Sequence, residues 1–218
     1  MTSSIEIVQS SLEHVDALAE LQRLVFPYLL PDEWFTAEMY RSHITVFPEG
    51  QMCALLHTDE GTIVVGETTT FRTNRSFEGD VPYYFEVIGN GYLTTHEPDG
   101  EWLYGVDVGV HPAYRRLGIG SRLYEARKQL VQRLNLRGEL VAGLLPGYEA
   151  YRQQMSVDAY VERVVTGELV DPTLSMQLRN GFQFRRLLKG YIHDPRSNDT
   201  VTLIVRENPS YVREPNVG

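Results

Sequence analysis

Apolar residues alternate or recur at helical spacing along most of the chain, and this pattern predicts an α/β fold. Between Leu12 and Val25 the apolar positions recur every three or four residues, as on one face of a helix. A second helix is expected to start after Pro31, where two acidic residues follow the proline. In the first hundred residues the pattern predicts strands at 5–8, 51–57 and 61–73, helices at 12–26 and 32–44, and a long loop with one short helix at 74–100.

The second half begins with a strand at 101–110, in which Val106, Val108 and Val110 are expected to share one face. Pro112 ends this strand, and the apolar spacing from Ile119 onward predicts an amphipathic helix of about four turns. The remaining predicted elements are a buried strand at 139–145, a polar helical insert at about 146–170, a helix at 171–181 and two strands at 182–192 and 200–207.

The 218 residues contain no repeat, no low-complexity segment and no Pro/Gly/Ser linker, so we expect a single domain over 1–218 with a mixed sheet. Cys53 is the one cysteine, which excludes an internal disulfide and favours a reducing compartment. The sequence starts without a signal-peptide pattern and contains no apolar run of about 20 residues. These features predict a cytoplasmic protein that does not enter membranes.

The charge is divided unevenly along the chain. The overall balance is −9, which disfavours nucleic acid as a partner because phosphate binding takes a surplus of Lys and Arg. Residues 1–100 contain 16 acids and 4 bases, whereas residues 101–218 contain 13 acids and 16 bases, seven of them between Arg115 and Arg137. A basic patch is therefore expected where the strand at 101–110 meets the following helix.

That junction, "HPAYRRLGIGS", has the composition of a diphosphate site. The first N–H groups of a helix are unpaired and carry partial positive charge, so a helix start attracts anions. Gly118 and Gly120 leave space over this backbone, Ser121 adds a hydroxyl, and Arg115 and Arg116 add charge. The third glycine of a dinucleotide fingerprint and the Lys-Ser/Thr of a phosphate-binding P-loop are both missing.

The stretch "VDVGVHPAYRRLGIGSRLYEA" resembles the coenzyme A signature of the GNAT superfamily of N-acetyltransferases. The central pattern of that signature, Arg or Gln, two residues, Gly, one residue, Gly or Ala, falls on Arg115, Gly118 and Gly120. The preceding "VHP" and the later "NGF" at Asn180 also match, as does the order of strands and helices.

The resemblance implies a GNAT fold whose mixed central sheet is splayed between the fourth and fifth strands, with the pantetheine arm of acetyl-CoA in the gap. Residues 101–206 would form the acetyl-CoA-binding core, and about 1–100 the acceptor side. Backbone groups of two strand valines would pair with the pantetheine, and amides at the helix start would hold the diphosphate. The implied coenzyme A residues are Val108, Val110, Arg115, Arg116, Leu117, Gly118, Ile119, Gly120 and Ser121. No metal is expected.

Acetyl transfer to an amine benefits from a general base, because most alkylamines are protonated at neutral pH. Asp107 is the first candidate, since its place in the strand sets it opposite the neighbouring valines and many relatives carry an acid near this point. Glu67 and Glu139 are weaker candidates. His111 belongs to the "HP" that is common in the family, where its role is usually structural.

The general acid that would protonate the departing thiolate is where the sequence departs from the family pattern. Many relatives have a tyrosine four residues before the glycine of "GF", and Gln177 occupies this position here. Tyr148 and Tyr151 follow the strand at 139–145 and are the candidates to replace it, with Tyr151 preferred as the catalytic residue.

The insert resembles acetyltransferase domains found fused to carbon–nitrogen hydrolases, and we expect it to be a lid or a partner surface. "LPDEWFTAEMY" and "EGDVPYYFEVIGNGY" are predicted to form an acidic and aromatic rim that favours a small cationic amine over a protein lysine. A homodimer is plausible for this fold. The alternative function is a non-catalytic module that binds coenzyme A as a sensor or scaffold.

Overall fold

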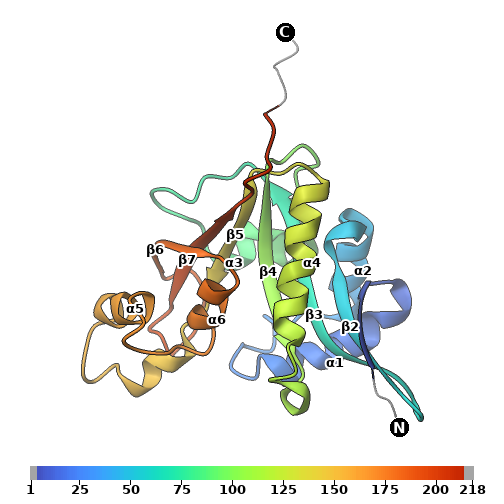
Figure 1. The fold of residues 1–218 in the computed structure, drawn as a ribbon, viewed down its shortest axis with the longest axis horizontal. Coiled ribbons are helices and arrows are strands. Elements are labelled where there is room, and N and C mark those ends of the chain that lie inside the picture. The colour runs from blue at the N-terminus through green and yellow to red at the C-terminus, as the bar shows by residue number, and fades with distance from the viewer. Residues whose placement is uncertain (1–3, 214–218) are drawn as a thin grey trace.

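The computed structural model describes residues 4–213, and its centre is a seven-stranded sheet in the order β1-β2-β3-β4-β5-β7-β6 (Figure 1). The strands are β1 (Ser4–Gln9), β2 (Met52–Thr58), β3 (Gly61–Thr73), β4 (Trp102–Val110), β5 (Gly138–Gly143), β6 (Gln183–Lys189) and β7 (Thr200–Glu207). The helices are α1 (Val15–Val25), α2 (Ala37–Val46), α3 (Tyr84–Val87), α4 (Ile119–Arg133), α5 (Val157–Val165) and α6 (Leu174–Arg179). β4 and β5 pair in parallel and the other neighbours pair antiparallel, which confirms the mixed sheet.

Helices cover both faces of this sheet (Figure 1). α4 crosses one face, where Leu123 and Leu130 are fully buried. On the opposite face α1, α2 and α3 form a core with the sheet that includes Leu18, Tyr40 and Tyr104. None of the helices within residues 4–213 has the length and apolar character that crossing a bilayer takes.

The second helix begins later than the sequence pattern predicts. α2 starts at Ala37, where the Thr36 side chain accepts a hydrogen bond from the Met39 amide at 3.2 Å. The preceding segment is irregular because the buried Glu33 carboxylate accepts hydrogen bonds from the Leu30 amide and from the Tyr83 hydroxyl. The prediction of a helix directly after Pro31 is therefore wrong.

The predicted helical insert after β5 is confirmed, and one buried carboxylate ties its two ends together. Asp171 is fully buried and accepts hydrogen bonds from the Gly147 amide at 2.9 Å and the Tyr160 hydroxyl at 3.0 Å. It also accepts one from the Leu174 amide at 2.9 Å, at the start of α6. The insert is thus fastened to the helix that carries the "NGF" segment.

The predicted splaying of the sheet is also confirmed. Parallel pairing between β4 and β5 ends at Gly105 and Val141. β4 continues to Val110, so residues 106–110 extend past the last pair with β5. Figure 1 shows the two strands diverging toward the N-terminal end of α4.

A β-bulge lies at the point of divergence. Thr69 of β3 pairs with Asp107, and the next residue, Thr70, pairs with Gly105, which leaves Val106 as an extra residue in β4. Such a bulge disrupts the ladder locally and re-aims the side chains that follow it.

The bulge overturns the prediction that three valines of β4 share one face. Val106 packs in the core on the side of α1 to α3, whereas Val108 and Val110 pack with Ile119 on the side of α4. The extra residue reverses the alternation of side chains once. Asp107 still lies opposite Val108, as expected, because both follow the bulge.

A buried ion pair lies where the strands part. The side chains of Arg127 from α4 and Glu139 from β5 are both fully buried and form a salt bridge, and Arg206 of β7 donates to the same carboxylate at 2.6 Å. The guanidinium of Arg127 occupies the space in which a Cβ at Gly105 would stand. The absence of a side chain at Gly105 is therefore what admits Arg127 to the sheet.

Replacing Gly105 with alanine should displace the Arg127 guanidinium from Glu139 and leave a buried charge without its partner. Breaking a buried pair in this way costs about 3–5 kcal/mol, which should appear as a lower free energy of unfolding in urea. Gly120→Ala is the matched control, since its Cβ would meet only the Val110 methyl at 3.9 Å. An unchanged stability of Gly105→Ala would contradict this account of the sheet.

Candidate active site

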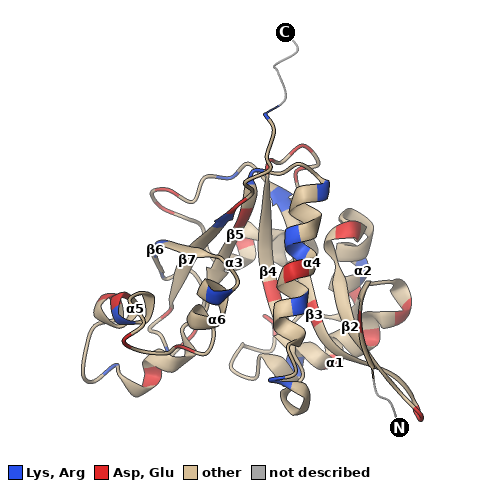
Figure 2. Cartoon of the chain, in the orientation of Figure 1, with Lys and Arg blue, Asp and Glu red and all other residues tan. Residues whose placement is uncertain are grey.

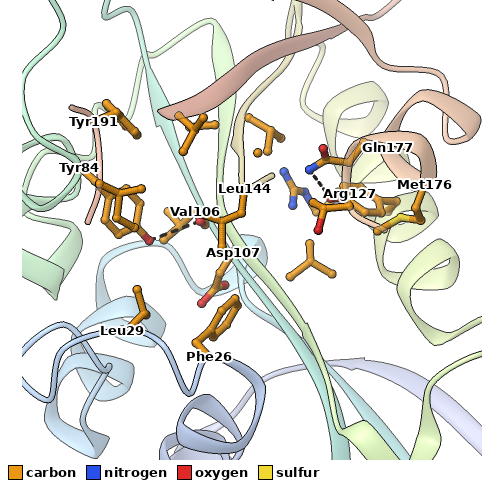
Figure 3. Close-up of a pocket in the computed structure, with 18 of the residues that line it drawn as sticks. Phe26, Leu29, Tyr84, Val106, Asp107, Arg127, Leu144, Met176, Gln177 and Tyr191 are labelled. Carbon is orange, nitrogen blue, oxygen red and sulfur yellow. Dashed lines mark hydrogen bonds between the residues drawn. The ribbon is translucent and has the colours of Figure 1, made fainter. Parts of the chain in front are cut away.

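A cavity of about 150 Å³ opens where β4 and β5 diverge. Its polar wall includes Asp107 from β4, Tyr124 and Arg127 from α4, Gly143 from β5 and Gln177 from α6. The side toward α1 and α3 is apolar and consists of Phe26, Leu29, Tyr84, Tyr191 and Ile192, several of which surround Asp107 in Figure 3. A cavity of this volume holds an organic group of about the size of benzene.

A groove of about 850 Å³ joins this cavity to the first turn of α4. Phe26, Leu29, Leu144 and Met176 line both spaces, so the cavity and the groove are continuous. The residues that the sequence assigned to coenzyme A and that line this groove are Val108, Val110, Arg115, Arg116, Gly118, Ile119, Gly120 and Ser121. Leu117 does not line it, and its side chain is 59% exposed.

The N-terminus of α4 opens onto the groove. Gly118 adopts a left-handed conformation with φ of 78°, and Arg116 does so with φ of 65°, which bends the backbone sharply before the helix. No side chain among residues 4–213 caps this helix start, and no atom lies within 4 Å of the place where a Gly118 Cβ would stand. The first amides of α4 are therefore available to an anion.

Four arginines border the groove, two more than the sequence analysis found. Arg179 at the end of α6 and Arg196 in the turn between β6 and β7 line it together with Arg115 and Arg116. Figure 2 shows that Lys and Arg also gather along α4 and in the loop before it. Arg179 could have been noticed from its place beside "NGF", whereas no local pattern marks Arg196.

Arg196 closes part of the groove. Its guanidinium makes two hydrogen bonds of 2.8 Å to the buried Asp194 carboxylate. The same guanidinium lies 4.3 Å above the ring of Tyr28, which belongs to the loop after α1 and also lines the groove. Two segments far apart in the sequence thus meet over the groove.

Asp107 lies in the cavity wall beside a second carboxyl group. Its Oδ1 accepts a hydrogen bond from the Thr69 amide at 2.9 Å, and its neighbour on β3 is the Glu67 carboxyl group, which is buried as well. Burial raises the pKa of Asp107, while the neighbouring Glu67, the bond from Thr69 and the charge of Arg127 oppose this rise. Burial and the neighbouring Asp107 raise the pKa of Glu67 well above its ordinary value.

Two other candidates have structural partners. Glu139 is committed to Arg127 and Arg206, so the structure gives it no contact with the cavity. His111 accepts a hydrogen bond on Nδ1 from the Ala113 amide at 3.2 Å and caps the turn before α4. Within residues 4–213 no group of three or more His, Cys, Asp or Glu side chains is arranged to bind a metal ion.

Gln177 contacts a tyrosine that the sequence analysis did not consider. Its Nε2 donates to the hydroxyl of Tyr124 at 3.2 Å, and its amide lies against Gly143, where a Cβ would stand 2.6 Å from Oε1. Both side chains line the cavity although both residues are only 2% exposed. Burial raises the pKa of Tyr124, so its hydroxyl keeps its proton at neutral pH. The signal was its position four residues after Gly120, on the same face of α4.

Tyr148 and Tyr151 lie elsewhere. The hydroxyl of Tyr148 donates to the Met155 carbonyl at 3.0 Å, and the rings of both tyrosines pack against Tyr160 in the core of the insert. Neither residue lines the cavity or the groove. The structure thus does not bring Tyr151 to the site at which the sequence analysis placed it.

The acidic rim predicted from two early segments is not part of the cavity. None of the six acidic residues of "LPDEWFTAEMY" and "EGDVPYYFEVIGNGY" lines it. Glu33 is the buried acid among them, and it fixes the loop through Tyr83. Of these segments Tyr84 alone reaches the cavity wall.

Two proteins of Bacillus subtilis (strain 168) are similar over most of the chain. The chain is 39% identical over 199 residues to the probable hydrolase YhcX, and this alignment covers 91% of this chain and 37% of that protein. It is 35% identical over 200 residues to the uncharacterized N-acetyltransferase YkwB, covering 90% of this chain and 86% of that protein. The chain thus spans little more than a third of the length of the first relative.

Solved structures share the fold. The GphF GNAT-like decarboxylase in complex with isobutyryl-CoA aligns with a TM-score of 0.75 at 20% identity, over 93% of this chain and 98% of its own. The loading GNATL domain of CurA from Lyngbya majuscula aligns with a TM-score of 0.76 at 20% identity, over 94% of this chain and 98% of its own. The ribosomal-protein-S18-alanine N-acetyltransferase from Escherichia coli aligns with a TM-score of 0.56 at 9% identity, over 99% of both chains.

The signature that the sequence analysis recognised lies inside the region that a family model covers. The model of the acetyltransferase (GNAT) family matches residues 15–150, which include the splayed strand β4, the turn with its glycines and all of α4. The YkwB similarity covers 90% of the chain and therefore extends beyond the region that this model matches. The chain belongs to the acetyltransferase (GNAT) family of acyltransferase enzymes.

Proposed function

We propose that this protein transfers the acetyl group of acetyl-CoA to the primary amine of a small molecule. The observation that carries this proposal is the continuous space that runs from the uncapped start of α4 to Asp107. Its basic end fits the phosphates of coenzyme A, and its narrow end fits a thioester next to a carboxylate.

The chain's own groups supply the binding chemistry for coenzyme A. Amides from Arg116 to Ser121 would hold the diphosphate, and the four groove arginines would balance the remaining phosphate charge. The free edge of β4 at Val108 and Val110 would pair with the amide groups of the pantetheine arm. Leu117, being exposed, would contribute through its backbone alone.

Asp107 is the proposed general base. It is the acidic residue that lines the cavity, and the bulge turns it to the side of α1 and α3, away from the groove at α4. An amine that enters from that side would give its proton to Asp107 and attack the thioester carbon with the freed lone pair.

Tyr124 is the proposed proton donor for the departing thiolate, in place of Tyr151. Gln177 donates to the Tyr124 oxygen, which leaves the hydroxyl hydrogen free to point into the cavity. Gln177 itself cannot supply a proton, so its role here is to orient the tyrosine.

The proposed acceptor is a small amine with an apolar body. The acceptor side of the cavity is lined by Phe26, Leu29, Tyr84 and Ile192, and the volume of about 150 Å³ limits the body to a few carbon atoms. This changes the expectation of a polyamine-like cation, which rested on acidic residues that lie outside the cavity. A protein lysine is disfavoured because the acceptor side is small.

A buried carboxyl site also argues against decarboxylation, the activity named for one of the solved structures. A decarboxylase has to bind an acyl group that carries a carboxylate. Arg127 in the cavity wall is already paired with Glu139, so the Asp107 carboxylate would repel such a group. The alternative of a module that binds coenzyme A without turnover remains an outcome of the activity test below.

We also propose that residues 1–218 act as one N-acetyltransferase domain in the cytoplasm. The central sheet runs through both halves of the chain, and its strand order brings β3 of the acidic half beside β4 of the basic half. The net charge of −9 supports a partner other than nucleic acid.

Blocking the diphosphate seat should abolish coenzyme A binding without loss of stability. Gly120→Leu places a bulky side chain over the first amides of α4, where the nearest atom to a new Cβ is the Val110 methyl at 3.9 Å. We expect a rise in Kd for coenzyme A of at least about 100-fold by calorimetry, with an unchanged melting temperature. Gln132→Leu, on the exposed far end of α4, is the control. Retained affinity in Gly120→Leu would refute the seat.

Removing the proposed base should prevent turnover but spare cofactor binding. Free thiol is followed while the protein is mixed with acetyl-CoA and a panel of small alkyl- and arylamines. Asp107→Asn should lower kcat/KM by about 10²–10⁴, with the Kd for coenzyme A unchanged. Tight binding of coenzyme A by the wild type without thiol release from any amine would favour the non-catalytic module.

Comparing two tyrosine variants distinguishes the proton donors. Tyr124→Phe should lower kcat by about 100-fold and remove the loss of activity at high pH, because no hydroxyl is left to ionise. Tyr151→Phe should behave as wild type, since its ring packs inside the insert. The reverse result would return the role to Tyr151.

A further inference from the structure

Two carboxyl groups face each other at the acceptor side of the cavity, and the proposed function uses one of them. Glu67 is 1% exposed and lies on β3, one strand away from Asp107. Among residues 4–213, neither of the Glu67 carboxyl oxygens nor Asp107 Oδ2 meets an N–H or O–H donor from any other group. The two carboxyl groups are neighbours on the same face of the sheet, and the presence of Asp107 raises the pKa of Glu67. A hydrogen bond between the two carboxyl groups would give these buried oxygens a partner, and it can form only when one of the groups is protonated.

The sheet is built to bring these groups together. Gly109 of β4 faces the Glu67 carboxyl, and a Cβ there would stand 2.5 Å from Oε1 and 3.3 Å from a Val25 methyl. A side chain at this position would fill the space that Glu67 occupies. Earlier in the same strand, the bulge at Val106 turns Asp107 to the same face. Two irregularities of β4 thus serve one carboxyl pair.

The neighbouring charges do not neutralise two carboxylates. Arg127 is the cation whose charge lowers the pKa of both groups, but it is paired with Glu139, and Arg206 shares that partner. Two arginines therefore face three acidic groups, and one proton restores the balance. A second bare carboxylate beside the first would be strongly unfavourable at this depth.

The other titratable groups around the pair are neutral at pH 7. Burial raises the pKa of the Tyr40 and Tyr84 hydroxyls well above the ordinary value and that of the Cys53 thiol to about 11. Burial lowers the pKa of His43 to about 4. These groups come from α2, α3 and β2, the elements that pack around β3 and β4, and none supplies a positive charge.

We propose that Glu67 is a positioning residue that keeps its proton at neutral pH and donates it in a hydrogen bond to the Asp107 carboxylate. The pair then carries one proton and one negative charge. Asp107 is held as the charged member, facing the cavity, and Glu67 fixes its orientation from behind. This inference deepens the proposed function, on which it rests, because it assigns the proton state in which the base meets the amine.

The proton balance of the transfer follows from that state. A protonated amine gives one proton to the Asp107 carboxylate, and both carboxyl groups are then neutral. The nitrogen lone pair forms the C–N bond to the acyl carbon, and the C–S bond breaks with its electron pair on sulfur, which takes a proton from Tyr124. The nitrogen loses its second proton to water, and Tyr124 takes back a proton from water. Asp107 then returns its proton to solvent, so the net release is one proton for each ammonium consumed.

A measurement without any ligand tests the shared proton. Folded protein that holds the proton of Glu67 binds one more proton than the unfolded chain above about pH 4.3, where a free Glu ionises. Its stability must therefore fall as pH rises, and the unfolding constant should increase by up to about tenfold per pH unit relative to Glu67→Gln. Urea unfolding of both proteins between about pH 5 and 8 measures this slope. Glu60→Gln, in the exposed β2–β3 turn, should keep the wild-type slope.

Infrared spectroscopy gives a second readout. The wild type at pH 7 should show the C=O stretch of a protonated carboxyl group, and this band should be missing from Glu67→Gln but present in Glu60→Gln. The proposal is overturned if the wild type has no such band and its pH slope equals that of Glu67→Gln. These results do not depend on whether any amine is acetylated.

Turnover then tests the positioning role. In Glu67→Gln the new side-chain amide keeps a donor toward Asp107, as a protonated acid does. This variant should retain kcat/KM within about fivefold, whereas Glu67→Ala should lose at least about tenfold at constant coenzyme A affinity. A loss in Glu67→Gln as large as in Asp107→Asn would mean that Glu67 acts as a carboxylate, which contradicts the inference. If no amine is turned over, the proposed function fails. The urea-unfolding and infrared measurements, which need no ligand, still show whether Glu67 keeps its proton.

Discussion

The buried ion pair between Arg127 and Glu139 is the interaction on which the site depends. It joins α4 to β5 at the level where β4 and β5 make their last pair, and Gly105 leaves the space for it. On one side of this level the two strands form an ordinary parallel ladder. On the other side they part, and α4 keeps its place over the gap because its arginine is fixed in the sheet. Such a pair is costly to desolvate, but it specifies one arrangement of helix and strands.

The same pair determines the electrostatics of the cavity. Because Arg127 is committed to Glu139 and Arg206 helps to neutralise that carboxylate, little positive charge is left for the acids on β3 and β4. The cavity therefore combines an apolar wall with a carboxyl pair that is short of a cation. This combination is the physical basis of the proposed acceptor, because an alkyl- or arylammonium ion brings both an apolar body and a dissociable proton.

Much of the fold and of the cofactor groove could be predicted from the sequence, because both depend on local patterns. The apolar run of β4, the glycines before α4 and the apolar period of α4 are properties of neighbouring residues, and the structure places β4 and α4 where they were predicted. The start of α2 could not be predicted in this way, since it depends on Glu33 reaching Tyr83, which is 50 residues away. The partner of Gln177 was missed for the same reason, as Tyr124 lies on a different helix. The residues of the cavity wall could not be predicted from the sequence. No sequence pattern marks Val106 as an extra residue in β4, and an acidic composition does not say which side chains face a cavity.

The bulge in β4 implies that the position of Asp107 is sensitive to the pairing register of the strand more than to the identity of the residue at position 106. Any medium-sized apolar side chain at position 106 would fill its share of the core, so substitution there should be easily accepted during evolution. Straightening the strand with every residue kept would instead return Asp107 to the side of α4, because Val106 would then alternate regularly after Tyr104 and Asp107 would take the opposite face. The face on which the Asp107 carboxyl lies is thus set by the pairing register of β3 and β4 and not by which apolar residue stands at position 106.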